Sequence, residues 1–469
     1  MGTPFDHIAD RDTDDAMNNF IRQFDAARGD IKSFVDVHLN WDGAGVETGF
    51  HAGSYNIIVS LKNTKTNEHV LVRFPFPGKI HEPWQERKVR NEVMTLKFLA
   101  QHTTIPVPRV YHWGMTEDSP GQLGPFIIEE FIEGESLGDL LKAPENDKNG
   151  RAYLHPDVDN TKLDLVYEQI AGFQLQLSRL GFGSIGAIDE VGDSGDFSVA
   201  EAPLTYDMNE VVAFAGFPAD HFKSSTTFKR ATDYFLERAR SLQLNLETHR
   251  NIGQEDEKLT WKRYVARRCF EKLIPAYCPA EDDLGPFRLF CDDLRPSNML
   301  ADPETMHIRA VIDLEFTNVL PAQFAYDVPW WLVLSNPATS ISNGDKQQFL
   351  DLFEPRMEQY IRAMKRAEAK LSPPLPATGE QPPRLLSARL RDSWDSGRFW
   401  FNLASRSSFD VDEIYWNCLH QDGRGEAMLD ETTLTVKDEF LRRKKEQFEA
   451  YFVEKKADKR FNNSDLGLD

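Results

Sequence analysis

Two short apolar stretches near the N-terminus predict a β-hairpin. Residues 55–61 and 69–74 are rich in β-branched and aliphatic side chains, which favour extended strands. Between them, residues 63–67 (Asn-Thr-Lys-Thr-Asn) have the composition of a turn. Pro75 and Pro77 then end the second stretch, because proline cannot donate a hydrogen bond to a strand ladder.

A helix and two further strands follow this hairpin. Apolar residues recur at helical spacing over residues 85–100, at Val89, Val93, Leu96 and Ala100. Strands are predicted at 107–113 and 126–132, and the loop between them contains proline and glycine. The chain up to residue 132 therefore predicts the order β-β-α-β-β.

The remainder of the chain predicts mainly helices. An amphipathic helix is expected over 163–180, mostly helical structure over 190–280 and a long helix over 435–456. Residues 372–383 are rich in proline and predict a connector. Residues 1–30 are polar and acidic, and they predict a tail followed by a short helix.

The segment 289–300 (Leu-Phe-Cys-Asp-Asp-Leu-Arg-Pro-Ser-Asn-Met-Leu) contains the main candidate chemistry. Asn298 follows Asp293 by five residues, and Asp313 comes fifteen residues later at the end of a short apolar stretch. A carboxylate can accept a proton from a hydroxyl, and amide and carboxylate oxygens are suitable Mg²⁺ ligands. The spacing therefore predicts phosphoryl transfer, with Asp293 as base and Asn298 and Asp313 as metal ligands. The alternative is a buried network of capping side chains in an unrelated hairpin.

This segment resembles the aminoglycoside phosphotransferase and choline kinase family, in the form found in filamentous fungi, and more distantly the protein-kinase catalytic loop. The resemblance covers about residues 40–335. It implies an α+β, two-lobed, protein-kinase-like fold. We expect residues 1–35 to form an N-terminal tail and helix, residues 36–133 a β-rich nucleotide-binding lobe, and residues 134–469 a larger helical lobe. The segment ending at Asp327 is similar to the one whose Asp supports the catalytic loop.

The same resemblance implies a nucleotide site in the smaller lobe. Residues 53–56 (Gly-Ser-Tyr-Asn) are similar to the glycine loop whose backbone approaches the phosphates. Arg73 has the position of the phosphate-facing Lys, and Glu92 that of its helix partner, although this pair alone would equally describe a surface ion pair. The implied nucleotide-binding residues are Gly53, Ser54, Asn56, Arg73, Glu92, Glu130, Phe131 and Ile132, the last three through hinge backbone groups near the adenine edge.

Several residues depart from the family pattern. Cys291 replaces the usual His and is interpreted as a buried packing residue. Asp292 replaces a common Gly, and as a second carboxylate it can raise a neighbouring pKa if both are buried. Arg73 replaces Lys but keeps a charge that can bind phosphate. Arg295, two residues after Asp293, is expected to stabilise the transition state.

Alternative interpretations concern the function and the acceptor site. Asp327 follows Asp313 by only fourteen residues, which is too short for the substrate platform of a protein kinase, so a small-molecule acceptor is expected. Residues 392–400 could form a wall of the acceptor site or an ordinary helix with core aromatics. Arg73 and Cys291 motivate a catalytically silent nucleotide-binding scaffold. Asp410-Val411-Asp412 matches the D-x-D pattern of glycosyltransferases, but an acidic chain contains such a pattern by chance.

Composition narrows the partners. The chain has 469 residues and a net charge of −21, which disfavours nucleic acid. Its four cysteines form no C-x-x-C pair, no basic leader opens the chain, and no apolar run is long enough for a membrane span. We therefore expect a cytoplasmic enzyme with no membrane partner, which uses Mg²⁺ and ATP, or GTP. The identity of the acceptor and the oligomeric state stay open.

Overall fold

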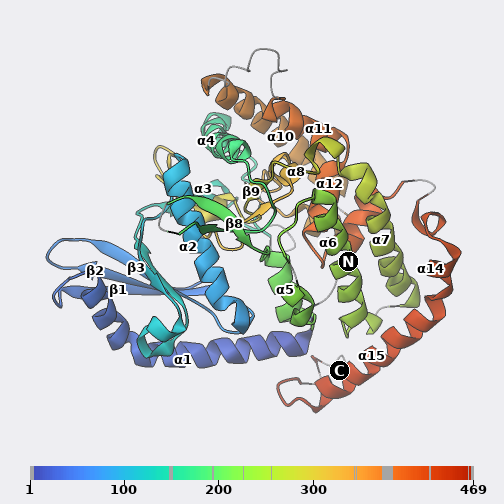
Figure 1. Cartoon of the computed structure of the whole chain (residues 1–469), viewed down its shortest axis with the longest axis horizontal. Coiled ribbons are helices and arrows are strands. Elements are labelled where there is room, and N and C mark those ends of the chain that lie inside the picture. Colours follow the sequence, from blue (N-terminus) through green and yellow to red (C-terminus); the bar gives the residue numbers. More distant parts are fainter. Residues whose placement is uncertain are drawn as a thin grey trace.

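Five antiparallel strands, in the order β1-β2-β3-β5-β4, form the sheet of the N-terminal lobe in the computed structural model (Figure 1). The structure describes residues 5–146, 151–192, 195–224, 226–254, 256–342, 344, 346–371, 384–421, 424–462 and 464–465. The predicted connector at 372–383 lies outside them. The strands are β1 (Gly45–Ala52), β2 (Asn56–Asn63), β3 (His69–Pro75), β4 (Val110–Gly114) and β5 (Phe126–Glu130).

The predicted order of elements is confirmed for β2, β3, helix α2 (Gln85–His102), β4 and β5. Strand β1 was missed. It pairs antiparallel with β2 along the sheet edge, and most of its residues are exposed. Because an edge strand with so little buried surface needs few apolar side chains, its sequence lacks the alternation that predicts a strand.

The prediction of a tail and a short helix over residues 1–30 is wrong, because this region forms one long helix, α1 (His7–His38). The Asp6 side chain caps it by accepting hydrogen bonds from the backbone N–H groups of Ile8 and Ala9. Phe20, Phe24, Ala27, Ile31 and Val35 pack against the sheet in one apolar core. The predicted boundary after residue 35 falls inside this helix, and we propose that α1 belongs to the N-terminal lobe. The boundary after residue 133 stays a prediction.

The larger C-terminal lobe is mainly helical, as predicted. Its longer helices are α4 (Asn160–Arg179), α5 (Tyr206–Phe214), α6 (Ala231–Thr248), α7 (Glu257–Tyr277), α10 (Lys346–Lys370), α11 (Leu386–Asp395), α12 (Arg398–Ser405) and α15 (Lys437–Ala457). The shorter ones are α3 (Leu137–Leu141), α8 (Ala322–Ala325), α9 (Pro337–Ser342), α13 (Val411–Ile414) and α14 (Glu431–Thr435). A hairpin of β7 (Ala187–Glu190) and β8 (Phe197–Glu201) was not predicted; it lies at the start of the region expected to be mostly helical. The chain therefore has a two-lobed, protein-kinase-like α+β fold.

Two short ladders position the loops that carry the candidate chemistry. Strand β9 (Arg288–Phe290) pairs with β12 (Asn318–Leu320), and β10 (Met299–Ala301) pairs with β11 (Ile308–Val311) and β6 (Glu135–Ser136). The loop after β9 contains Asp293, and the loop after β11 contains Asp313. Because Phe290 pairs with Asn318 and Met299 with Val311, both loops connect the same two ladders and run side by side.

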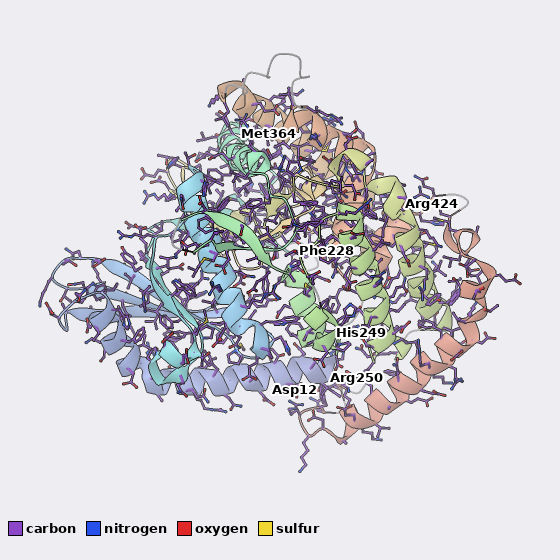
Figure 2. The ribbon with its side chains drawn as sticks, viewed as in Figure 1. Asp12, Phe228, His249, Arg250, Met364 and Arg424 are labelled. Atoms are coloured by element: carbon purple, nitrogen blue, oxygen red, sulfur yellow. The ribbon has the colours of Figure 1, made fainter. Side chains whose placement is uncertain are left out.

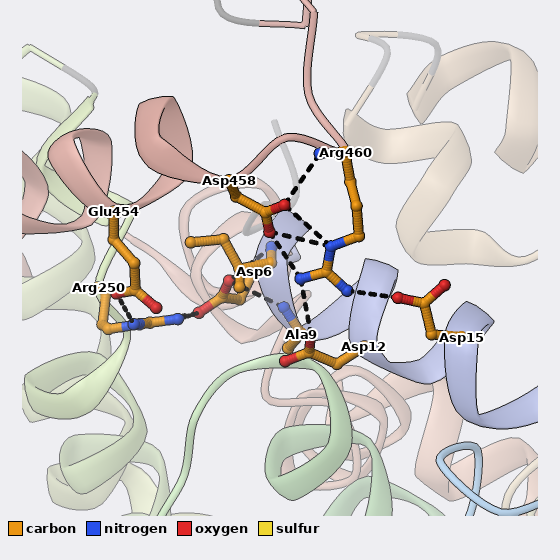
Figure 3. A network of polar contacts seen from close by, with 9 residues as sticks. Asp6, Ala9, Asp12, Asp15, Arg250, Glu454, Asp458 and Arg460 are labelled. Carbon is orange, nitrogen blue, oxygen red and sulfur yellow. Dashed lines mark hydrogen bonds and ion pairs between the residues drawn. The ribbon is translucent and has the colours of Figure 1, made fainter.

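Helix α1 also reaches the C-terminal lobe (Figure 1). Asp6 forms an ion pair with Arg250, just after α6, and Arg250 also pairs with Glu454 on α15 (Figure 3). Arg460 adds contacts to Asp12, Asp15 and Asp458. His249 and Arg250 lie at the end of α6 that faces α1 (Figure 2). The two lobes are thus joined by this helix as well as by the β5–β6 connection.

The described helices differ from membrane-spanning ones. Within the described ranges, none combines the length and the hydrophobicity that a bilayer crossing requires.

Candidate active site

Asp293 and Asn298 lie side by side on the loop between β9 and β10. The Asn298 side-chain amide donates to the Asp293 carboxylate at 2.7 Å and to the Asp293 backbone carbonyl at 3.0 Å. Arg295 forms an ion pair with the other carboxylate oxygen at 2.7 Å. The Asp293 side chain is 43% exposed, so a ligand can reach it. Burial of part of the carboxyl raises its pKa, and the charge of Arg295 opposes this effect.

Three side chains that the sequence analysis missed hold this loop from behind. The indole N–H groups of Trp330 and Trp331 donate to the backbone carbonyls of Asp292 and Leu294, at 3.2 and 2.6 Å. Arg406 forms an ion pair with the Asp292 carboxylate. Asp292 therefore serves as an anchor of the loop. The two tryptophans follow Asp327 closely in the sequence, which was the available signal.

Asp313 lies beside this loop because the two loops are hydrogen-bonded to each other. The backbone N–H of Ile312 donates to the carbonyl of Asn298 at 2.9 Å. Asp313 has a φ of 54°, in the left-handed region that is uncommon for residues other than glycine. Its side chain is 40% exposed. Partial burial of the carboxyl raises the pKa of Asp313 to about 6, and the charge of Arg73 opposes this shift.

Arg73 connects the N-terminal lobe to Asp313. Its Nη1 lies 3.5 Å from Asp313 and 3.3 Å from Glu129 on β5, and its Nη2 binds Glu92 on α2. Arg73, Glu92 and Glu129 are all buried, so the surface ion pair is excluded as an interpretation. Glu129 was missed by the sequence analysis. Burial raises its pKa to about 7, against the opposing effect of Arg73.

The glycine loop forms the tight connection between β1 and β2. The Gly53 N–H donates to the Asn56 carbonyl at 2.9 Å, and a Cβ on Gly53 would meet only that oxygen, at 3.4 Å. The fold itself thus has no need of glycine here, and Ser54 is exposed beside it. The Asn56 side chain is bound within the protein, since it accepts from Lys88 and donates to Glu315, at 2.9 and 3.0 Å.

The hinge strand leaves one backbone donor for a nucleotide base. Two of the three predicted N–H groups are already used: Glu130 donates to Arg109 and Phe131 to His69, at 2.9 and 3.2 Å. Among the described residues, the N–H of Ile132 has no hydrogen-bond acceptor.

Asp327 is buried beneath the site. Its carboxylate accepts hydrogen bonds from Ser393 on α11 and Asn402 on α12, the latter at 3.0 Å to each oxygen. Asp327 was predicted to support the loop at 291–298. Its direct hydrogen-bond partners are instead on helices α11 and α12. Burial raises the pKa of Asp327 to about 6, and Arg406 opposes the shift.

Comparison with known proteins decides the family. The sequence profile of the phosphotransferase enzyme family matches residues 52–340, which is more than half of the chain and spans every loop described above.

The chain belongs to the phosphotransferase enzyme family.

Curated relatives are yeast proteins named "Altered inheritance of mitochondria protein 9, mitochondrial". The Saccharomyces cerevisiae protein is 28% identical over 142 residues, 30% of this chain and 21% of that protein. The Lachancea thermotolerans protein is 22% identical over 352 residues, 67% of this chain and 55% of that protein. The chain thus spans between a fifth and about half of these relatives. Their names contradict the expected cytoplasmic location, which was wrong.

Solved structures with a similar fold include a thermostable mutant of an aminoglycoside phosphotransferase in complex with ADP and hygromycin B. It is 11% identical, with a TM-score of 0.41, and the match covers 90% of this chain and 98% of that one. An ethanolamine kinase from Plasmodium vivax is also 11% identical, with a TM-score of 0.41, covering 88% and 83%. A shared fold does not transfer a substrate from one protein to another.

The structure bears on Cys291, a departure from the family pattern, and on residues 392–400, the candidate wall of the acceptor site. Cys291 is buried, and burial raises the pKa of its thiol to about 12. It therefore packs as a neutral side chain, as the sequence analysis interpreted it. Of residues 392–400, Phe399 and Trp400 are buried, and Trp394 stacks on Phe353 with ring centres 5.1 Å apart. The aromatic side chains of this segment thus pack into or against the core, and Ser393 of the same segment hydrogen-bonds to Asp327.

A cavity of about 70 Å³ lies behind the loop of this family member. It is lined mainly by apolar side chains, with Asp292, Asp327 and Arg406 as its charged groups; the aromatic ones are Phe290, Phe324, Trp330, Trp331 and Tyr360.

Tyr55 docks the glycine loop of this family member on α5. Its hydroxyl donates to Glu210 at 2.6 Å and lies 3.1 Å from the hydroxyl of Tyr206. Burial raises the pKa of Glu210 to about 7, while the hydrogen bond from Tyr55 opposes the shift. This contact holds the glycine loop against the C-terminal lobe.

Glu210→Gln should remove a component of the pH dependence of stability. Between pH 4.5, the ordinary carboxyl pKa, and about 7, folded Glu210 keeps a proton that the unfolded chain has lost. This contribution is fully present below pH 4.5 and is lost as the pH rises to about 7. The unfolding free energy of the wild type minus that of the variant should therefore fall by about 2–3 kcal/mol over this range. Urea titrations at several pH values measure it, and a difference that grows with pH would contradict it.

Proposed function

We propose that this chain transfers the γ-phosphate of Mg·ATP to a hydroxyl group of a small molecule. The observation that carries the proposal is the meeting of the two lobes at Asp313. There the Arg73 guanidinium arrives from β3, 3.5 Å from the carboxylate, and Asn298 and Asp293, 2.7 Å apart, arrive on the adjoining loop. Membership of the phosphotransferase family supports the reaction class.

Asp293 would act as the base. It is exposed enough to meet an acceptor hydroxyl, and Asn298 holds one of its oxygens in place. The hydroxyl oxygen forms a bond to the γ-phosphorus, the bond between that phosphorus and the ADP oxygen breaks, and the hydroxyl proton passes to Asp293. Arg295, on the same carboxylate, would counter the negative charge that develops on the transferred group.

The donor atoms suit a magnesium ion. Within the described chain, the Asn298 side-chain oxygen receives no hydrogen bond and one Asp313 oxygen is free of ion pairs. These are hard oxygen ligands, and Mg²⁺ typically takes one or two such protein ligands together with phosphate oxygens. No cluster of three or more His, Cys, Asp or Glu side chains suited to a metal occurs in the described ranges, so nucleotide oxygens would complete the shell. The ion would supply charge neutralisation at the phosphates.

The nucleotide would lie between the lobes. The backbone at Gly53 and Ser54 would face the phosphates, where a side chain on residue 53 would obstruct them. Arg73, held by Glu92, would bind phosphate oxygens through its fork. The Ile132 N–H would bind the base edge, and Glu130 and Phe131 would shape that edge.

The alternative function is a nucleotide-binding scaffold without turnover. It is favoured by one observation: Arg73 is shared among three carboxylates, Glu92, Glu129 and Asp313. Such a network could hold the site in place without chemistry. Nucleotide binding is common to both proposals, and turnover separates them.

Calorimetric titration tests the nucleotide site. We expect Mg²⁺-dependent binding of ATP, or of GTP, and at a hundredfold excess over Kd a stabilisation of about 2.7 kcal/mol. Asp313→Asn should weaken the Mg²⁺-dependent binding by about tenfold or more, since a hard ligand is lost. Asp25→Asn, on the outer face of α1, is the control and should bind as the wild type does. Folded protein that binds neither nucleotide would contradict both proposals.

By analogy with the names of its yeast relatives, we propose a mitochondrial location for this chain. Subcellular fractionation of cells that express the protein tests it.

A further inference from the structure

A buried lysine that was not among the predicted site residues connects three segments of the site. Lys88 on α2 is 1% exposed, and it forms an ion pair with Glu315. Its Nζ also lies 2.9 Å from the Asn56 side-chain oxygen and 3.7 Å from Glu92. Asn56 in turn donates to the same Glu315 carboxylate at 3.0 Å. Lys88, Asn56 and Glu315 therefore form a closed triangle between the lobes, which we call the Lys88 bridge.

The bridge holds a backbone segment that needs support. Glu315 lies two residues after Asp313, between β11 and β12. Both Asp313 and Phe316 have left-handed backbone conformations, with φ values of 54° and 60°. Such conformations persist only where surrounding contacts hold them. Glu315 supplies a contact of this kind, because its carboxylate is fixed by two groups of the N-terminal lobe.

The charges around the Lys88 bridge explain why the positive charge of Lys88 is needed to keep Glu315 in place. Four carboxylates meet two cations here: Arg73 faces Glu92, Glu129 and Asp313, while Lys88 faces Glu92 and Glu315. Within the described residues, Lys88 is the only cation in ion-pair contact with Glu315. Without it, the buried carboxylate of Glu315 would repel Asp313 nearby and would lose the partner that keeps it in place.

We propose that Lys88 is a positioning residue. Through Glu315 it places Asp313 for the metal, and through Asn56 it places the start of β2 next to the glycine loop. This inference rests on the proposed function, because it gives Asp313 the role of metal ligand. Lys88 itself touches neither the metal nor the nucleotide. Its removal should change the requirement for Mg²⁺ more than the affinity for the nucleotide alone.

Lys88→Met tests the bridge, since methionine keeps most of the length without the charge. The measurement is the Mg²⁺ concentration that gives half of the Mg²⁺-dependent increase in ATP affinity, by calorimetry, together with thermal unfolding. We expect this concentration to rise about tenfold, with metal-free ATP binding changed by less than about threefold. Lys97→Met is the matched control on the same helix, where Lys97 forms an exposed pair with Glu190 at 3.0 Å. It should resemble the wild type.

The double variant Lys88→Met/Glu315→Gln separates positioning from a simple loss of stability. It leaves no unpaired carboxylate, so it should unfold near the wild-type temperature and yet keep the raised Mg²⁺ requirement. A wild-type Mg²⁺ requirement in either variant would overturn the inference. If the single variant does not fold, the double variant alone tests the inference. If the wild type binds nucleotide without any effect of Mg²⁺, the proposed function and this inference both fail, whereas an unchanged variant of a Mg²⁺-dependent wild type overturns the inference alone.

Discussion

Asp293→Asn should lower the rate of phosphoryl transfer by about 10²–10⁴-fold, the usual contribution of a general base. The amide cannot accept the acceptor's proton, while it can still hydrogen-bond to Asn298. Because the Asp293 side chain is 43% exposed, its loss should cost little stability, and Mg·ATP should still bind. The rate is measured as ADP release from Mg·ATP with an acceptor identified from a panel of small alcohols.

Asp292→Asn provides the contrast from the neighbouring position. Asp292 pairs with the buried Arg406 and anchors the loop from behind. Its replacement should lower the unfolding temperature, and any loss of rate should accompany that change. If Asp293→Asn instead keeps the wild-type rate within about threefold, the proposed base is wrong. If the wild type itself binds nucleotide and transfers no phosphate to any acceptor, the scaffold becomes the better account.

Asp412→Ala should destabilise the protein by about 3–5 kcal/mol, the range measured when one partner of a buried ion pair is removed. The Asp412 carboxylate is bound by Arg263 at 3.1 Å and by Arg267 at 3.0 and 3.1 Å, and all three side chains are buried. Alanine would leave both guanidinium groups without this partner in the interior. Urea unfolding measures the change.

Glu446→Ala is the matched control for this prediction. Glu446 pairs with Arg442 on the surface of α15, and such pairs contribute about 0–1 kcal/mol. The experiment also bears on the D-x-D motif. The partners of Asp412 are Arg263 and Arg267, and Asp410 accepts from Ser407 at 2.7 Å, so we expect a structural role. A variant that keeps its stability but loses Mg²⁺-dependent binding would instead indicate a metal site.

Local pattern was sufficient for the elements and residues whose signal lies within a short stretch. The β2–β3 hairpin and α2 follow from the spacing of apolar positions, which a strand or a helix imposes on its own sequence. Asp293 and Asn298 are five residues apart on one loop, and the structure places them in contact. Helix α1 was predicted too short although its apolar positions have helical spacing, because the acidic residues in its first half resemble those of a tail.

The tertiary structure decided which distant side chains meet. Asn56 was expected at the nucleotide, but its amide binds Glu315, 259 residues further along the chain. Glu129 and Lys88 gave no signal in the sequence, since a single charged residue in a strand or helix is compatible with an exposed position. Their roles depend on burial next to particular opposite charges, and burial is set by how the lobes pack. The sequence alone thus indicated the family and predicted the central residues of the site, while packing between segments far apart in the chain determined the network that surrounds them.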